Sequence, residues 1–193
     1  CKAPVLCILP SESQAQQFSQ DISFFTSTTC LHYPGYEIPP YTPLSPDPQT
    51  TAHRLFSLYS IQTIPESYAI ITSIEALLRK VMPAEILTQL AELVMAGEET
   101  DQQKLITNLV ASGYEQMSLV QNAGEFSHRG GIVDIFPPGF SYPIRLDFFG
   151  DFIESMRTLD PISQRSIDQL DEAEIIPVHD ILYPPVNSDA HRR

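Results

Sequence analysis

The sequence is poor in basic residues and in long apolar runs, and each scarcity excludes a class of function. Its 193 residues include 11 lysines and arginines against 24 acidic residues, which gives a net charge of −13. A chain with that charge repels the phosphate backbone over most of its surface, so we do not expect it to bind duplex DNA by itself. No apolar run reaches the length of a membrane span and no signal peptide is visible, so no membrane partner is expected.

Cysteine is scarce too, and the motifs that hold nucleotides or metals are missing. The three cysteines, Cys1, Cys7 and Cys30, form no CxxC pair, which is typical of reduced thiols in a cytoplasmic protein. The phosphate-binding pattern G-x-x-x-x-G-K-[ST] does not occur. We therefore expect no catalytic residue, no metal and no cofactor in this chain. Because the chain begins at Cys1 and not at methionine, we interpret it as a piece of a longer protein.

The first part of the chain alternates between predicted strands and helices. Ser11 with Gln14 forms a capping box before one amphipathic segment, and Thr51–Ile61 forms a second. The strand–helix–strand order predicts a parallel α/β layer. Short apolar runs predict its strands, with the first and last expected to be buried, at Pro4–Leu9, Thr29–His32 and Tyr68–Thr72.

A proline-rich loop runs from Tyr33 to Asp47 and carries Tyr33, Tyr36 and Tyr41. Tyrosines in such a loop could stack on bases. With no basic residue among them, we expect them instead to pack the loop onto its own domain.

The pattern changes near residue 83. A strand around Leu93–Met95 and a helix begun by a capping box at Thr100 and Gln103 precede a series of antiparallel strands. Ile132–Phe136 and Ile144–Phe149 are separated by Pro137-Pro138-Gly139, and Gly150-Asp151 has the spacing of a tight hairpin leading into Phe152–Thr158. One helix with such strands predicts an α+β domain.

Alternation within Ile144–Phe149 predicts two unlike faces. Ile144, Leu146 and Phe148 share one face, which must be core, while Arg145, Asp147 and Phe149 share the other. Two charges beside an exposed phenyl ring are typical of a binding surface as much as of a solvated one, in which Asp147 would simply neutralise Arg145. Upstream, Arg129 precedes Gly130-Gly131, where the backbone can turn sharply or approach a neighbour, although a simple bulge fits as well.

From Gly124 to Ser166 the sequence resembles, almost without a gap, the second domain of UvrB and its counterpart in bacterial transcription–repair coupling factors. The resemblance implies an incomplete P-loop-like parallel α/β layer, similar to the first domain of UvrB, at residues 1–82. It further implies an inserted UvrA-binding domain of antiparallel sheet and helix at residues 83–176, and a return to the α/β region with a C-terminal tail at 177–193. The short Tyr33–Asp47 loop favours the coupling factors over UvrB.

The same resemblance implies a non-catalytic interaction module that recruits UvrA in transcription-coupled nucleotide excision repair. Its UvrA-contacting residues fall on Arg129, Arg145 and Phe149. We expect alanine at these positions to weaken binding with little effect on stability. In the full-length protein the family uses ATP and Mg²⁺ for DNA translocation, and reaches RNA polymerase and duplex DNA through domains absent from this sequence.

Two alternatives remain open from the sequence. The chain could be a fragment of UvrB acting in damage verification on DNA, or an ATPase using the tetrad Asp171-Glu172-Ala173-Glu174, which spells a helicase box. Without a P-loop or a buried apolar strand before it, we interpret the tetrad as acidic clustering at a strand edge. His179-Asp180 has no third partner nearby in sequence, so we assign it no chemistry.

Overall fold

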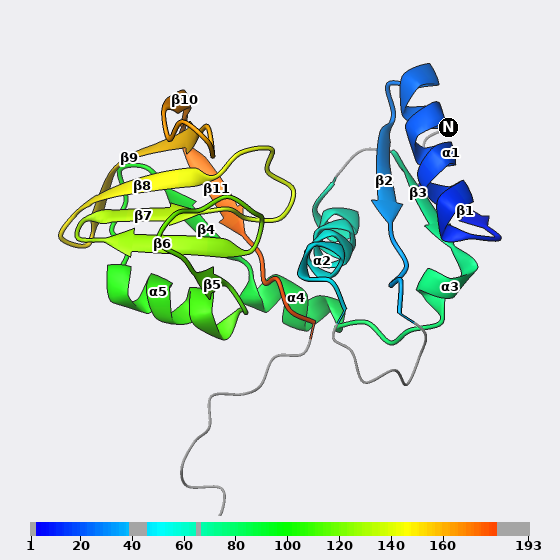
Figure 1. The fold of residues 1–193 in the computed structure, drawn as a ribbon, viewed down its shortest axis with the longest axis horizontal. Helices are drawn as coiled ribbons and strands as arrows, with labels where there is room; N and C mark the ends of the chain where they lie inside the picture. Colours follow the sequence, from blue (N-terminus) through cyan, green and yellow to red (C-terminus); the bar gives the residue numbers. More distant parts are fainter. Residues whose placement is uncertain (1–2, 39–45, 65–66, 181–193) are drawn as a thin grey trace, which may run out of the picture. The chain divides into compact units, whose positions relative to one another are not determined.

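The computed structural model describes residues 3–38, 46–64 and 67–180. The chain divides into two compact units, Cys1–Thr88 and Gln89–Arg193 (Figure 1). The helix α4, Ala84–Leu90, runs across the division. The predicted mixture of a parallel and an antiparallel sheet is confirmed.

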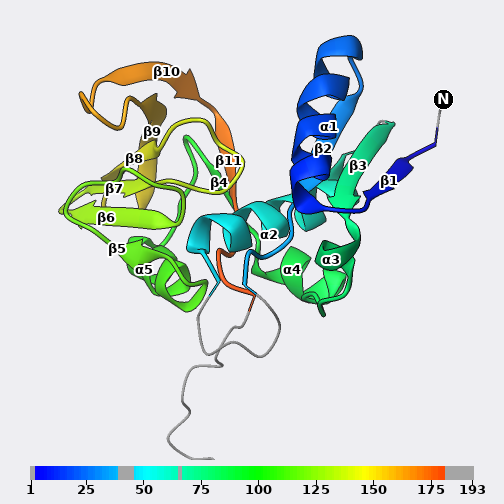
Figure 2. The ribbon, with the colours of Figure 1, turned by 45° about the vertical axis from the view of Figure 1, so that its right-hand side comes forward.

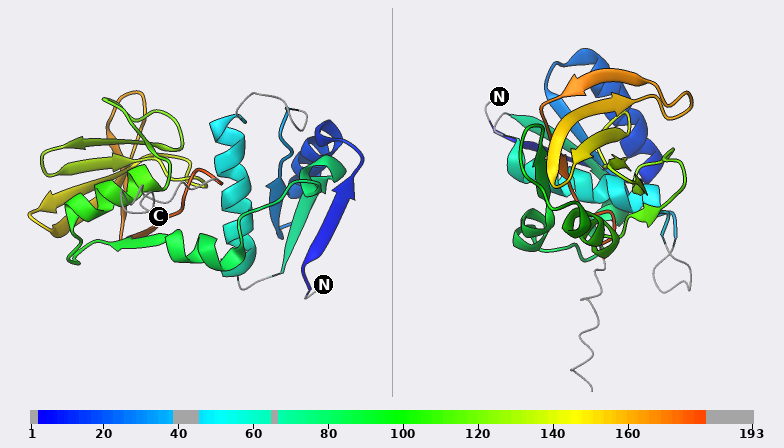
Figure 3. Two further views of the ribbon diagram at one scale, coloured as in Figure 1. Left: turned by 90° about the horizontal axis from the view of Figure 1, so that it is seen from below. Right: turned by 90° about the vertical axis from the view of Figure 1, so that its left-hand side faces the viewer.

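Unit 1 contains a three-stranded parallel sheet, as predicted, and its strand order is β1-β3-β2. Its helices α1 and α2 lie on opposite sides of this sheet (Figures 1 and 3). Adjacent residues of β2 show the same division, because His32 lies beside Glu12 of α1 while Tyr33 contacts Arg54 of α2. The elements of this unit are β1 (Val5–Leu9), α1 (Glu12–Phe25), β2 (Thr29–Tyr33), α2 (Pro48–Thr63), β3 (Tyr68–Ser73) and α3 (Ile74–Leu77).

Strand β1 differs from the prediction of a buried strand. Val5, Leu6 and Ile8 are all exposed. The physical reason is position, because β1 is an edge of the sheet and pairs only with β3 in the part of the chain that the structure describes. A run of apolar residues indicates burial only when both faces are covered.

Tyr33, the last residue of β2, and Tyr36 just after it pack on arginines of their own unit. The guanidinium carbon of Arg54 lies 4.2 Å from the ring centre of Tyr33 and 4.4 Å from that of Tyr36, and Arg79 lies 4.9 Å from Tyr36. Arg54 also donates to the carbonyl oxygen of Pro34. Such cation–π contacts hold the loop on its domain, which confirms that interpretation for Tyr33 and Tyr36. Tyr41 lies outside the described residues.

The predicted helix cap at Ser11 is confirmed, and the cap predicted at Thr100 lies one residue further on. Ser11 accepts from the amide of Gln14, and Ser73 accepts from the amide of Ala76. The cap of the later helix is Asp101, which accepts from the amide of Lys104 at 2.9 Å. The amide of Thr100 donates instead to the carbonyl oxygen of Asp151 at 2.6 Å, so Thr100 belongs to the preceding strand-like segment.

Unit 2 is built on a six-stranded sheet in the order β10-β9-β8-β7-β6-β5, with β4 and β11 forming a separate antiparallel pair. The run from β6 to β10 is antiparallel, as predicted, while the short β5 lies parallel to β6. Figure 2 shows α5 beside β5 and β6. The elements are β4 (Glu92–Met95), α5 (Gln102–Ala111), β5 (Glu115–Gln116), β6 (Glu125–Arg129), β7 (Ile132–Ile135), β8 (Ile144–Phe149), β9 (Phe152–Leu159), β10 (Ser166–Leu170) and β11 (Glu172–Ile175).

One face of this sheet forms the core of unit 2. Ile144, Leu146 and Phe148 are buried on it, as alternation predicted. Their direct partners across β8 and β9 are Thr158, Met156 and Ile153. A shift of register between Asp147 and Phe148 marks a β-bulge in this pairing, so alternation along β9 breaks between Ile153 and Met156.

The last described residues stay on unit 2. The hydroxyl of Tyr114 donates to the carbonyl oxygen of Ile176 at 2.8 Å, and the amide of Val178 donates to that of Ser112 at 3.0 Å. Val178, in the segment 177–193 for which a return to the α/β region is predicted, therefore contacts unit 2, and residues 181–193 lie outside the described part.

The two glycines after Arg129 are required for different structural reasons. Gly130 has φ +61° and forms the turn between β6 and β7. At Gly131 a Cβ atom would lie 2.6 Å from the carbonyl oxygen of Phe148, because β8 approaches the backbone there. The pair is thus both a sharp turn and a close approach, the first of the two interpretations of this sequence.

We predict that Gly131→Ala lowers the free energy of unfolding by about 1–3 kcal/mol, since backbone atoms cannot move aside as a flexible side chain would. Urea unfolding followed by circular dichroism measures the loss. Gly130→Asn is the matched control: it should cost less, because asparagine tolerates positive φ and no atom lies within 4 Å of a Cβ there. A Gly131→Ala chain as stable as the parent would contradict the close approach.

Candidate functional site

The register of the sheet places the three residues predicted for docking on one face. Direct partners across antiparallel strands share a face. Arg129 pairs with Ile132, Ile132 pairs with Asp147, and Asp147 lies two residues from both Arg145 and Phe149. The outer face, as we call the face opposite the core, includes over β6 to β9 Ser127, Arg129, Ile132, Asp134, Arg145, Asp147, Phe149, Phe152, Ser155 and Arg157.

A buried carboxylate at the centre of the outer face connects the two predicted arginines. Asp134 is 1% exposed. Arg145 donates to it from both sides of the carboxyl group, Nε to Oδ1 at 2.6 Å and Nη2 to Oδ2 at 2.8 Å. Arg129 donates Nη2 to the same Oδ2 at 3.2 Å, and the hydroxyl of Ser127 does so at 3.4 Å. Strands β6, β7 and β8 therefore each contribute to one hydrogen-bonded group.

The attraction between the Asp134 carboxylate and the two guanidinium groups is strong because the carboxylate is removed from water. A buried carboxylate is costly unless it is paired and hydrogen-bonded, and Asp134 is both. The hydrogen bond from Arg145 to Asp134 raises the pKa of Arg145; partial burial opposes this, and the charges of Asp134 and Asp147 add to it. A bidentate guanidinium–carboxylate pair also fixes the plane of the guanidinium, so Arg145 is held in one orientation.

Asp147 does not neutralise Arg145, contrary to the simplest interpretation of the sequence. Its Oδ2 accepts from Arg157 Nη2 at 2.7 Å and from the hydroxyl of Ser155 at 2.7 Å. The ion pairs of the outer face therefore join three arginines to two aspartates, on a chain whose net charge is −13. A partner that presents carboxylates would match this face better than it matches the rest of the molecule.

The three predicted residues differ in how far they reach into solvent. The side chain of Arg129 is 54% exposed and that of Arg145 is 16% exposed. Phe149 is 76% exposed at the end of β8. The sequence predicts that alanine at all three positions leaves stability nearly unchanged. For Arg145 the structure instead predicts a loss of stability, because its guanidinium compensates the buried charge of Asp134.

Sequence reasoning missed Asp134, although the sequence carries a signal for it. The residue stands in the apolar run Ile132-Val133-Asp134-Ile135. A carboxylate inside such a strand needs a cationic partner on its own face, and Arg145 on the next strand is a candidate. What the sequence does not give is the register that pairs Asp134 with Arg145.

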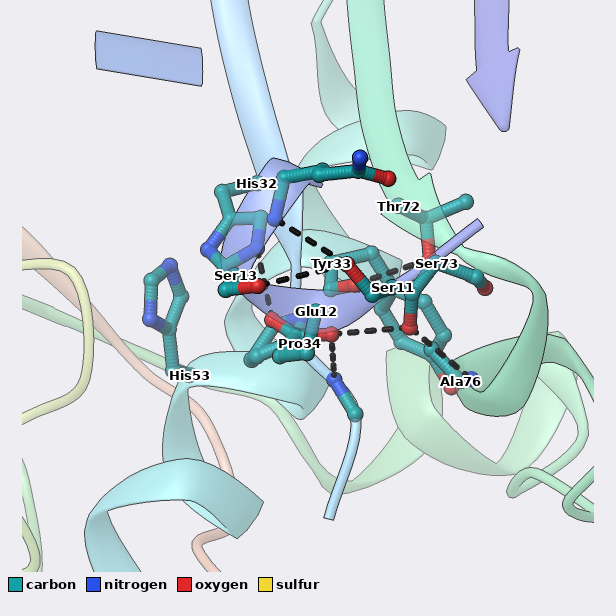
Figure 4. Close-up of polar contacts among 12 residues, drawn as sticks. Ser11, Glu12, Ser13, His32, Tyr33, Pro34, His53, Thr72, Ser73 and Ala76 are labelled. Atoms are coloured by element: carbon teal, nitrogen blue, oxygen red, sulfur yellow. Dashed lines mark hydrogen bonds and ion pairs between the residues drawn. The ribbon is translucent and has the colours of Figure 1, made fainter. Parts of the chain in front are cut away.

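A second polar cluster lies at the carboxyl end of the parallel sheet in unit 1, the place where α/β proteins often bind ligands. Figure 4 shows Glu12 between His32 and Ser73. Its Oε2 accepts from the amide of Gly35 and from the hydroxyl of Ser73, each at 2.8 Å, and its Oε1 lies 2.9 Å from His32 Nε2 without hydrogen-bond alignment. Glu12 accepts from Gly35 and Ser73 and lies beside the His32 ring, so we assign the cluster a structural role.

The acidic tetrad shows the geometry of an ordinary edge strand. On β11 Ala173 and Ile175 are buried, while Glu172 and Glu174 are exposed. Across the described residues no group of three or more His, Cys, Asp or Glu side chains is placed to hold a metal ion. His179 packs against Gly113. Within the same ranges, none of the helices is both long and apolar enough to span a membrane.

Comparison with known families identifies the domain that carries the outer face. Residues 93–180 match the family model described as the UvrB interaction domain. This range includes every strand of the six-stranded sheet, so the antiparallel part of the chain is similar to that family's domain.

Almost the whole chain is similar to transcription-repair-coupling factors. It is 37% identical to the protein of Myxococcus xanthus over 94% of the chain, and 32% identical to that of Escherichia coli (strain K12) over 92%. The protein of Bacillus subtilis (strain 168) is 30% identical over 94%. The chain spans only 16%, 15% and 16% of these relatives' own length. The resemblance to coupling factors seen in the sequence is confirmed.

We predict that Asp134→Ala lowers the free energy of unfolding by about 3–5 kcal/mol, because it leaves the largely buried guanidinium of Arg145 without its partner. Urea unfolding measures this. Asp147→Ala is the matched control and should cost only about 1 kcal/mol, since its pair with Arg157 is more exposed. Equal losses of stability in the two variants would show that the Asp134–Arg145 pair stabilises the domain no more than the Asp147–Arg157 pair does.

Proposed function

We propose that this chain is an interaction module of a transcription-repair-coupling factor, and that it docks UvrA through the outer face of its antiparallel sheet. In this role it recruits UvrA in transcription-coupled nucleotide excision repair and performs no catalysis of its own. The observation that carries the proposal is the arrangement of Arg129, Arg145 and Phe149 on one face. Asp134 binds the guanidinium groups of Arg129 and Arg145, which come from the two neighbouring strands. The exposed phenyl ring of Phe149 lies on the same face.

This arrangement has the composition of an interface hot spot. Arginine and aromatic residues dominate such sites, because they combine apolar burial with directed hydrogen bonds. The group around Asp134 adds preorganisation, since a guanidinium already fixed in the free protein loses less conformational entropy on binding. Arg129 keeps most of its donors free, because only its Nη2 bonds to Asp134. It is therefore the guanidinium best placed to meet a carboxylate of the partner.

The proposal also assigns the parts of the chain. Residues 83–176 form the UvrA-binding domain, while residues 1–82 belong to a region similar to the first domain of UvrB. The parallel order β1-β3-β2 supports the second assignment. No cofactor is needed for docking, so we propose none in this chain. ATP, Mg²⁺, RNA polymerase and duplex DNA belong to other parts of the full-length protein, which we propose to be an ATP-dependent DNA translocase.

We predict that Arg129→Ala and Phe149→Ala each weaken UvrA binding by about 1–3 kcal/mol, as expected for hot-spot residues, with melting temperatures close to that of the parent. Isothermal titration of purified UvrA with this chain measures the change. Arg145→Ala should weaken binding as well, but it must be assayed with a check of folding because it leaves Asp134 short of a partner.

Matched controls lie on the same domain away from the outer face. Arg165→Ala removes an exposed arginine, and Ile162→Ala removes a side chain that is 88% exposed. Neither should change UvrA affinity. Phe148→Ala, one residue from Phe149 but buried in the core, should unfold the domain. Wild-type affinity in both Arg129→Ala and Phe149→Ala would refute the proposed face.

We further predict that the chain shows no detectable binding to duplex DNA at physiological salt, because its negative charge exceeds its positive charge by 13. A mobility-shift assay with a labelled duplex tests this. A shift that weakens steeply with added salt would favour the rival function in damage verification on DNA.

A further inference from the structure

Phe149 does not stand alone at the end of the outer face. It pairs directly with Phe152 across the two-residue turn Gly150-Asp151. Partners of this kind share a face and bring their Cβ atoms to within about 4.5–5.5 Å. Phe152 is 41% exposed. Two adjacent phenyl groups thus face solvent on one hairpin, although burial would favour each of them.

The hairpin that presents this pair is braced on its own domain. The segment before α5 forms backbone hydrogen bonds with β9. The amide of Gly97 donates to the carbonyl oxygen of Ile153 at 2.8 Å, and the amide of Ile153 donates to the carbonyl oxygen of Glu98 at 3.0 Å. The side-chain amide of Gln102 donates to the carbonyl oxygen of Gly130 at 3.0 Å, which links the neighbouring turn to the same segment. A braced pair of aromatic side chains loses little backbone entropy on binding, so it suits an anchor better than a mobile loop would.

The charges around the pair differ from one side to the other. Toward the middle of the sheet lie Arg129 and Arg145, whereas at the turn lie Asp151 and the exposed Glu98 and Glu99. The backbone of Glu99 forms an isolated antiparallel β-bridge with the backbone of Phe152. A surface that covers both phenyl groups therefore meets positive charge on one side and negative charge on the other.

We infer that Phe152 is a second apolar anchor for UvrA, so that the docking face continues across the turn onto β9. The partner surface is an apolar pocket of UvrA that receives both phenyl groups. This pocket carries carboxylates on the side of Arg129 and cationic groups on the side of Asp151. This inference rests on the proposed function, and it names a contact that the resemblance to the family did not assign.

The test compares UvrA affinity of the whole chain with Phe152→Ala, Phe152→Leu and Ile162→Ala. Phe152→Ala should weaken binding roughly tenfold, a typical loss for a buried aromatic anchor. Phe152→Leu, which keeps an apolar side chain and guards against a folding defect, should lose less. Ile162→Ala should be unchanged. Because the two rings share a pocket, the double variant Phe149→Ala with Phe152→Ala should lose less than the product of the single losses.

The outcomes separate this inference from the proposed function. If Phe149→Ala and Arg129→Ala weaken binding but Phe152→Ala does not, the anchor on β9 is refuted while docking through the outer face stands. If none of the variants weakens binding, the proposed function itself fails. If sedimentation of the chain alone shows a dimer that Phe152→Ala disperses while UvrA affinity is unchanged, the occupant is a second copy of the chain, which overturns the inference.

Discussion

The carboxylate of Asp134 is the group on which the outer face depends. It sits on β7, between β6 and β8, and is almost fully buried. A charge in that position is tolerated only because Arg145, Arg129 and Ser127 all donate to it. In satisfying Asp134 the sheet also fixes two guanidinium groups at the surface. One interaction thus stabilises the domain and shapes the face through which we propose that it binds.

Core and face are two consequences of the same alternation. Val133 and Ile135 point to the core beside Asp134, and Leu146 does so beside Arg145. Because the register is fixed by the Gly130-Gly131 turn and by the close approach of β8 at Gly131, the arginines cannot move without moving the core. On an acidic chain, this group of arginines next to exposed phenyl rings distinguishes the outer face from the rest of the described surface of unit 2.

Local pattern was enough to predict most elements, both kinds of sheet and the face shared by Arg145 and Phe149, whereas Arg129 was joined to them only through the resemblance. It failed where an outcome depended on distant neighbours. The exposure of Leu6 and Ile8 follows from the place of β1 in the sheet order, and the pairing of Arg145 with Asp134 follows from the β7–β8 register. Neither the sheet order nor the β7–β8 register can be derived from the local sequence pattern. The cap at Asp101 was missed because Thr100 is engaged by Asp151, a residue far from it along the chain.

Hydrogen exchange of the whole chain, free and bound to UvrA, tests the central claim most directly. If UvrA docks on the outer face, amides around the β6–β7 and β8–β9 turns, at Arg129–Gly131 and Phe149–Phe152, should exchange more slowly in the complex. Amides of the β9–β10 connection around Ile162 should be unaffected. Unchanged exchange at both turns together with protection elsewhere would contradict docking through this face.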